Sequence, residues 1–270
     1  MNAAVISDRE FDKFRGLIYQ KAGISLSPVK KTLVAGRLGS RLRHYGLNSY
    51  GAYYQMVTEE GADRELQVMV DLLTTNETYF FREPKHFDTL SSKILPKYKH
   101  TDNFRVWSAA SSSGEEAYSI GMTLAHELGF NKQWRVLGTD ISSRVLERAR
   151  RGLYPMTAMD KIPKQYLREY CLKGVRSQQG TLMIDKKIRD RVSFTPLNLN
   201  GDWPKMEKFD VIFLRNVMIY FDIDTKRALV NRLADFIKPG GYFIIGHSET
   251  LNSVSNRFTM LSPSIYQLAK

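Results

Sequence analysis

Hydrophobic and polar positions divide the chain into a helical first quarter and a longer part in which strands and helices alternate. In residues 1–72, apolar side chains recur at the three- and four-residue spacing of amphipathic helices, as at Phe11, Phe14, Leu17 and Ile18. Ser7 has the spacing to Glu10 of a capping box at the start of this helix. No strand-like alternation interrupts the pattern, so we predict a small all-α N-terminal domain over 1–72.

A polar junction over 73–90 separates this domain from residues 91–270. There, short apolar runs end in polar residues and lead into helical patterns. The predicted strands are 104–109, 135–139, 211–214, 242–246 and 264–268, and the predicted helices are 115–128, 142–151 and 224–236. This alternation is typical of an α/β fold with a mostly parallel sheet and helices on both faces. Residues 172–195 break the rhythm. Leu182–Asp185 and Val192–Thr195 there suggest a small antiparallel β insertion.

Three of the strands end in polar residues that we expect to meet in one crevice, since ligands of open α/β sheets bind at the carboxyl ends of the strands. The first ends in Ser111–Gly114 and two acids, Glu115 and Glu116; the second ends at Asp140; the third ends at Arg215 and Asn216. A loop with one glycine and two acids does not suit a pyrophosphate, which argues against NAD and ATP. An acid in the position of Asp140 typically accepts hydrogen bonds from the hydroxyl groups of a ribose.

A ribose, a positive charge and no phosphate together describe S-adenosylmethionine. Its carboxylate needs hydrogen-bond donors, and Asn76, Thr78 and Arg82 in the polar junction have suitable side chains. Whether Glu115 or Glu116 faces the cofactor stays open at this point.

Charge and composition limit the kinds of partner, compartment and metal site that the protein can have. The net charge is +12, and the segment 13–58 contains no acidic residue, which indicates an acidic partner. A single cysteine, Cys171, allows no internal disulfide and fits a reducing cytoplasm. The sequence has neither a secretory signal nor an apolar run near the ~20 residues of a membrane span. The five histidines lack ligand spacing, so we predict no metal site and interpret them as surface or packing residues.

The chain resembles the chemotaxis receptor methyltransferases, the CheR family. The resemblance covers almost the whole chain and lies in motifs that are weak singly and specific together. They are Asn76–Arg82, Trp107–Ser119, Gly138–Ser142, Pro196–Leu199, Phe209–Phe221, Lys238–Gly241 and His247–Thr250. It implies a class I, Rossmann-like methyltransferase fold: a seven-stranded, mostly parallel sheet with one antiparallel strand near the C-terminus.

The resemblance also implies a reaction and a set of site residues. S-adenosylmethionine would methylate glutamate carboxylates on the cytoplasmic helices of methyl-accepting chemotaxis receptors, leaving S-adenosylhomocysteine, for adaptation in bacterial chemotaxis. Tyr220 and Arg82 are the expected catalytic residues, with Tyr220 beside the methyl group. The expected cofactor-binding residues are Asn76, Thr78, Arg82, Glu116, Asp140, Asn198, Leu199, Arg215 and Asn216. In some relatives the β insertion docks a receptor C-terminal peptide; the sequence does not decide this here.

Receptor methylation regions are rich in glutamate, so a cationic helix is a fitting partner for them. We therefore expect Arg37, Arg41 and Arg43 to dock the receptor, and reversal of charge at Arg41 and Arg43 to weaken methylation without loss of cofactor binding.

We further expect a monomeric, cytoplasmic enzyme that does not insert into membranes or act on nucleic acid. Amino-directed DNA methyltransferases carry prolines where this chain has Arg215–Met218. Two competing classes are a non-catalytic S-adenosylmethionine sensor and a nicotinamide dehydrogenase. The polar residues at three strand ends argue against the sensor, and the acidic, glycine-poor loop argues against the dehydrogenase.

Overall fold

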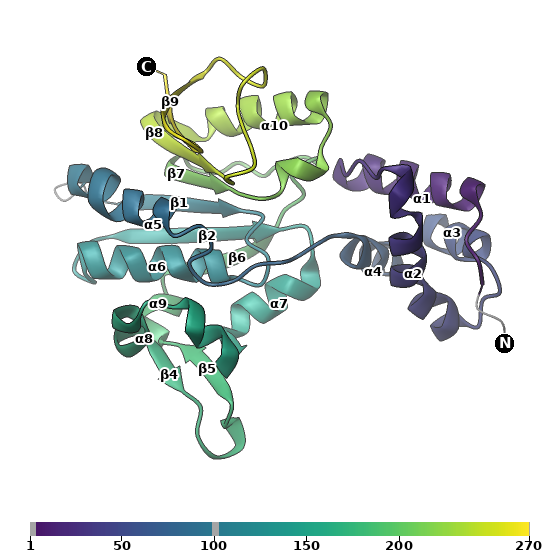
Figure 1. Ribbon diagram of the computed structural model, residues 1–270, viewed down its shortest axis with the longest axis horizontal. Coiled ribbons are helices and arrows are strands. Elements are labelled where there is room, and N and C mark those ends of the chain that lie inside the picture. The colour runs from purple at the N-terminus through teal and green to yellow at the C-terminus, as the bar shows by residue number, and fades with distance from the viewer. Residues whose placement is uncertain (1–3, 99–102, 270) are drawn as a thin grey trace.

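The computed structural model describes residues 4–98 and 103–269, and its first part is the helical domain expected from the sequence (Figure 1). The helices are α1 (Asp8–Ala22), α2 (Lys31–Tyr45), α3 (Tyr50–Thr58) and α4 (Asp63–Leu73), with a 3-10 turn η1 (Pro28–Lys30) before α2. The capping box of α1 is confirmed: the Ser7 hydroxyl accepts from the Glu10 backbone, and the Glu10 carboxylate accepts from Ser7. Phe14 and Ile18 are fully buried in the core of this domain.

The second part contains a seven-stranded sheet in the order β6-β2-β1-β7-β8-β10-β9. Its strands are β1 (Phe104–Ala109), β2 (Trp134–Asp140), β6 (Val192–Pro196), β7 (Phe209–Leu214), β8 (Ile237–Ile245), β9 (Phe258–Ser262) and β10 (Ile265–Leu268). The pairings from β6 through to β8 are parallel, whereas β10 runs antiparallel to both of its neighbours. The expected seven-stranded sheet with one antiparallel strand is therefore confirmed.

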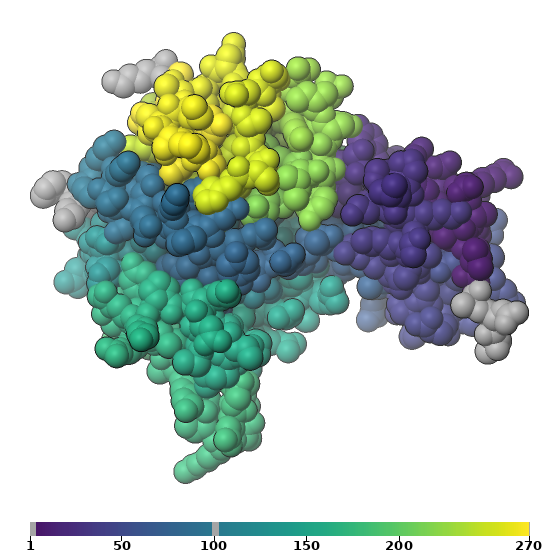
Figure 2. Space-filling model, in the orientation of Figure 1, coloured from purple at the N-terminus to yellow at the C-terminus, as the bar shows by residue number. Residues whose placement is uncertain are grey.

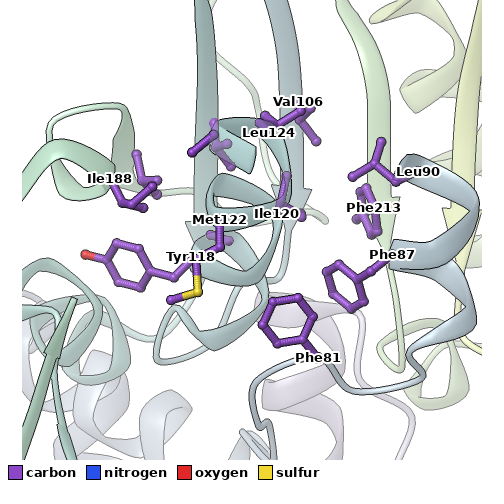
Figure 3. Packing of buried hydrophobic residues seen from close by; sticks show 14 of the residues in the cluster. Phe81, Phe87, Leu90, Val106, Tyr118, Ile120, Met122, Leu124, Ile188 and Phe213 are labelled. Atoms are coloured by element: carbon purple, nitrogen blue, oxygen red, sulfur yellow. The ribbon is translucent and has the colours of Figure 1, made fainter. Parts of the chain in front are cut away.

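Helices cover both faces of this sheet. On one face lie α5 (Lys85–Thr89), the π-helical turn η2 (Leu90–Ile94) and the 3-10 turn η3 (Leu95–Tyr98), together with α6 (Glu115–Leu128) and α7 (Ser143–Arg151). On the other lies α10 (Ile223–Asp235). Strand β7 shows why both faces need cover, because Phe213 packs in the α5–α6 cluster (Figure 3) while its neighbours Ile212 and Leu214 pack in the α10 cluster. Among helices of the described residues, none has the length and apolarity to cross a bilayer.

The small β insertion exists, but its strands differ from the predicted pair. They are β3 (Leu153–Pro155), β5 (Thr181–Ile184) and β4 (Cys171–Lys173), paired antiparallel in that order, with η4 (Met156–Lys161), α8 (Lys164–Tyr170), η5 (Arg176–Gln178) and α9 (Lys186–Arg189) between or beside them. The predicted strand at 192–195 is instead β6, an edge strand of the large sheet.

The assignment of 192–195 to the insertion was therefore wrong, and packing explains the difference. Residues Val136–Asp140 of β2 pair in parallel with β6. The Phe194 ring lies over Gly138, where an added Cβ would stand 2.6 Å from the ring. Glycine in β2 thus makes room for the aromatic side chain that joins β6 to the sheet, a contact that local sequence does not reveal.

The expected turn at Pro239–Gly241 lies inside strand β8. The β7–β8 register moves from Phe209 opposite Ile237 to Val211 opposite Tyr242, so the turn residues bulge from the ladder. Gly240 has φ 72°, a left-handed value that glycine adopts without strain. The predicted turn is therefore present as a local bend, but the sequence did not predict that strand β8 continues through it.

Candidate active site

A cavity holding about 890 Å³ of space, part of it open to solvent, lies at the carboxyl ends of β1, β2 and β7. Its wall combines apolar side chains with a few convergent polar groups, as is typical of small-molecule sites. The structure brings every cofactor-binding residue expected from the sequence, together with Tyr220, to the wall of this one cavity. These residues are Asn76, Thr78, Arg82, Glu116, Asp140, Asn198, Leu199, Arg215, Asn216 and Tyr220.

Asp140 is fixed at the end of β2 by two backbone donors. The Ser112 N–H donates to Oδ2 and the Ser142 N–H donates to Oδ1, each at 2.9 Å. Ser112 reaches this position with φ 50°, a left-handed value, in the loop after β1. Ser142 precedes α7 as predicted, but its hydroxyl makes no capping bond. Burial raises the pKa of Asp140, whereas these backbone bonds lower it. A carboxylate has about four acceptor sites, so Asp140 can accept from a diol in addition to these backbone groups.

The structure separates the two glutamates that the sequence left undecided. Glu116 lines the cavity, accepts from the Ser108 hydroxyl at 2.7 Å and pairs with Arg215 at 3.1 Å. Glu115 is buried away from the cavity and accepts from the Ser113 hydroxyl at 2.7 Å. Burial raises the pKa of Glu116, and the Arg215 guanidinium counteracts that rise. Glu116 is therefore the acid placed to face a bound cation.

Arg215 is the hub of a buried network behind the cavity. Its side chain is 1% exposed and donates to Glu116, to Glu83 at 3.1 Å and to the Arg82 carbonyl at 2.5 Å. Its charge is thereby shared between two carboxylates, so Arg215 acts on the cavity mainly through Glu116. Glu83, which sequence reasoning did not single out, has φ 56°. Such strain in a non-glycine residue persists where surrounding contacts hold it, as Arg215 does here.

Asn76, Thr78 and Arg82 form the cavity wall contributed by the polar junction. The Arg82 guanidinium donates to the Glu77 carbonyl at 2.8 Å and lies 5.7 Å from the centre of the Tyr79 ring. The Asn76 carbonyl accepts from the Ser112 hydroxyl at 3.0 Å, which ties the junction to the loop after β1. Arg82 keeps further guanidinium N–H groups for a carboxylate.

Glu249 holds the loop after β7 and was not identified as a site residue from the sequence. Its carboxylate accepts from the backbone N–H groups of Asn216, Val217 and Gly246 at 3.0, 3.1 and 2.7 Å. Asn216 adopts φ 58° in this loop. Because the loop leads directly into Tyr220, Glu249 fixes the wall that contains the expected catalytic tyrosine. Its place in the His247–Thr250 motif was the available sequence signal.

The N-terminal domain completes the cavity. Ala22 and Ile24 line it, and the Ser25 N–H donates to the Tyr220 carbonyl at 2.8 Å. The Asn198 side chain turns toward this domain and donates to the Lys21 carbonyl at 2.6 Å, which ties the cavity wall to the end of α1. Figure 2 shows the first helices packed against the later α10 region. No sequence signal pointed to Ala22 or Ile24, because a short-range pattern does not show which domain closes a cavity.

The three arginines expected to dock a partner have different surroundings in α2. The Arg37 guanidinium donates to the Leu73 and Thr74 carbonyls. Arg41 forms a bidentate pair with Glu65, at 2.8 and 2.7 Å. Arg43 is exposed. Arg37 and Arg41 thus join α2 to α4 and to the residues that follow α4. Docking of the receptor by these arginines stays a prediction, and Arg43 has the most accessible charge of the three.

Glu83, His86 and His247 lie close enough to converge on a metal ion. The sequence did not foresee this grouping, because His247 is 164 residues from Glu83. Arg215 already neutralises Glu83, and burial lowers the pKa of His86 to about 3, with the Arg215 charge acting in the same direction. A second cation at this place would meet the guanidinium, so we interpret the group as part of the buried Arg215 network.

The cavity suits S-adenosylmethionine in its charges and its apolar wall. A bound S-adenosylmethionine would find Glu116 available for its positive charge, Asp140 for its ribose hydroxyls and Arg82 for its carboxylate. Ile141, Leu197 and Leu199 give an apolar wall suitable for a purine. Glu116 and Asp140 both line the cavity, and their negative charges would repel a phosphate.

Comparison with known proteins agrees with this site. Residues 76–266 match the family described as CheR methyltransferase, SAM binding domain, and residues 9–74 match CheR methyltransferase, all-alpha domain. The chemotaxis protein methyltransferase of Escherichia coli (strain K12) is 39% identical over 98% of this chain and 92% of its own length. The chemotaxis protein methyltransferase of Borreliella burgdorferi is 37% identical over 97% of this chain and 95% of its own length. Chemotaxis protein methyltransferase 2 of Pseudomonas aeruginosa is 36% identical over 96% of this chain and 93% of its own length.

Among solved structures, the glycopeptide N-methyltransferase MtfA complexed with S-adenosylmethionine aligns over 63% of this chain and 51% of its own, with a TM-score of 0.38 and 15% identity. That overlap is too low to add to the evidence of the family matches, which span both parts of the chain. The chain therefore belongs to the CheR family of S-adenosylmethionine-dependent chemotaxis methyltransferases.

Proposed function

We propose that this enzyme methylates glutamate side chains on the cytoplasmic helices of methyl-accepting chemoreceptors, and that it acts as a monomer in the cytoplasm. The observation that carries the proposal is the cavity itself, in which Glu116 and Asp140 are set for a cationic nucleoside and Tyr220 stands in the loop after β7. The chemotaxis methyltransferase names of its relatives supply the class of substrate.

The site suits a carboxylate as acceptor because it offers positioning, and the described residues that line it include no histidine, lysine or cysteine. When bound, S-adenosylmethionine supplies a methyl group on a sulfonium for in-line attack. A glutamate carboxylate is ionised at neutral pH and needs no general base. The role left to the protein is to align the carboxylate and exclude water from it. Tyr220 and the buried Phe221 form an apolar wall for this purpose, and Arg82 and Glu116 would hold the methionine moiety through its carboxylate and its positive charge.

The charge of the N-terminal domain supports an acidic, helical partner. The acid-free segment 13–58 contains eight lysines and arginines, and Arg43 is exposed on α2. Nucleic acid is a weaker candidate for the acidic partner, because the loop after β7 reads Arg215–Met218 and lacks the prolines that amino-directed DNA methyltransferases carry there.

The test uses purified enzyme, methyl-labelled S-adenosylmethionine and membranes containing chemoreceptors, followed by mild alkali. We expect label on the receptor band and its release as methanol, the behaviour of a carboxyl methyl ester. An Asp140→Ala variant is the control for dependence on the cofactor site and is expected to give no label. Alkali-stable label, or label on nucleic acid, would contradict the proposal. Tight cofactor binding without transfer to any acceptor would favour a non-catalytic sensor.

A further inference from the structure

We propose that an apolar surface beside the cavity, formed by Tyr19, Ile219 and Ile223, contacts the receptor helix that carries the acceptor glutamate. The inference rests on the proposed function and names the part of the enzyme, beyond its basic helix, that recognises the substrate. It concerns residues that neither the cofactor site nor the α2 arginines include.

The three side chains are exposed to an unusual degree for their size. Tyr19 is 43% exposed, Ile219 is 50% and Ile223 is 43%. Single exposed apolar residues are common on protein surfaces and need no explanation. These three come from two different domains, and a hydrogen bond from Tyr19 to Asp222 brings α1 to the segment that carries both isoleucines, which is the arrangement expected of a contact site.

One hydrogen bond joins Tyr19 to the segment of the two isoleucines across the junction of the domains. The Tyr19 hydroxyl of α1 donates to Asp222 Oδ2 at 2.7 Å. Asp222 lies between Ile219 and Ile223 in sequence and caps α10, accepting from the Thr225 N–H at 2.8 Å. The surface is thus preformed, so a partner would not have to order it on binding.

The surface borders the cavity directly. Ile219 precedes Tyr220, which lines the cavity and is bonded to Ser25 through its carbonyl. Ile223 follows Phe221, another lining residue, by two positions. A segment that delivers a side chain to Tyr220 would therefore come close to the part of the chain that carries the two isoleucines.

Charge and geometry together favour a glutamate-bearing helix as the occupant. Tyr19 belongs to the acid-free segment 13–58, with exposed Lys21 beside it, which favours an acidic partner. The nearby acid Asp224 is paired with Arg227 at 3.6 Å. On a helix, residues three and four positions from a glutamate share its face. Apolar residues at these positions would meet Ile219 and Ile223 when the glutamate enters the cavity.

The test compares two double variants of the full-length enzyme. Ile219→Ser with Ile223→Ser removes the apolar surface, whereas Met260→Ser with Leu261→Ser removes residues of 58% and 51% exposure from β9. All four are already exposed, so neither pair of changes is expected to disturb folding. We expect the first variant to raise the KM for receptor about tenfold, as loss of interface anchors does, with kcat at saturating receptor and the Kd for S-adenosylmethionine changed less than about twofold. The β9 variant should match the wild type.

Three results would overturn the inference. An unchanged receptor KM in the isoleucine variant would exclude the contact, and an equal rise in the β9 variant would show a general effect of surface polarity. Weaker S-adenosylmethionine binding would assign the isoleucines to the cofactor cavity. If the wild type itself forms no alkali-labile ester on receptors, the proposed function fails and this inference with it, which separates the two failures.

Discussion

At the scale of single residues, the start of α6 shows how neighbouring identical side chains receive different environments. Glu115 and Glu116 differ by one position on a helix and therefore by about 100° around its axis. Glu116 consequently faces the cavity and Arg215, while Glu115 points to Ser113. The helix turn thus resolves an ambiguity that composition and loop pattern left open.

This difference predicts unequal effects of the same substitution. Glu116→Gln should weaken S-adenosylmethionine binding by roughly 1.5–3 kcal/mol, the range for hydrogen bonds to charged groups, or about 10- to 100-fold in Kd. It also leaves Arg215 without one of its two carboxylates. Glu115→Gln, the matched control, should leave the Kd within about threefold of wild type. Titration calorimetry with the cofactor measures both, and the reverse order would contradict the assignment of Glu116.

At the scale of elements, the arginines of α2 hold helices together as well as adding charge. The Arg41–Glu65 pair joins α2 to α4, with side chains 21% and 11% exposed. Glu65 also accepts from the Tyr45 and Tyr53 hydroxyls at 2.9 and 2.7 Å. Charge reversal at Arg41 would therefore break a half-buried junction, so loss of methylation in that variant would not by itself show that Arg41 docks the receptor.

We accordingly expect Arg41→Ala to lower the free energy of unfolding by about 2–4 kcal/mol, since removal of one partner leaves the other charge partly buried and unpaired. Arg43→Ala, at an exposed position of the same helix, should change it by less than about 0.5 kcal/mol. Urea unfolding followed by circular dichroism compares the two. Equal stability of both variants would show that the Arg41–Glu65 pair contributes little. Arg43→Glu is then the cleaner test of docking, through receptor methylation at matched cofactor affinity.

At the scale of the whole molecule, the buried Arg215 network joins segments distant in the chain and makes stability depend on pH through His86. The His86 ring is 1% exposed, contacts Ser264 at 3.0 Å and lies 4.7 Å from the His247 ring. Burial holds its pKa at about 3 in the folded protein. The unfolded chain binds a proton at this histidine below about pH 6.5, whereas the folded chain does so only below about pH 3.

The direction of the pH dependence follows from the lower pKa of His86 in the folded state. Because the unfolded state binds more protons, the free energy of unfolding falls as pH drops from about 6.5 toward 3, by up to about 1.4 kcal/mol per pH unit from this group. His86→Gln, which keeps a hydrogen-bonding side chain beside Ser264, should remove that part of the slope. Urea unfolding at pH 7, 6, 5 and 4 gives the difference between wild type and variant. Parallel curves over this range would show that His86 titrates normally in the folded protein.

Sequence alone determined most of the helices and sheet strands, and it named most of the residues that line the cavity. Apolar spacing set the helices of the N-terminal domain, and short apolar runs ending in polar residues set β1, β2 and β7. Local spacing suffices there, because the periods of helix and strand are properties of neighbouring residues. Since parallel strands expose their carboxyl ends at one edge, the same pattern predicted that an acid at 115 or 116 would meet Asp140 and Asn216.

Tertiary structure decided what depends on contacts across the chain. It placed β6 in the large sheet through Phe194 over Gly138, chose Glu116 over Glu115, and closed the cavity with Ala22 and Ile24 of the other domain. It also gave Arg41 an internal partner and brought Glu83, His86 and His247 together. Pairing, burial and ion pairs of this kind depend on residues far apart in sequence, and their distances are fixed only when the elements pack.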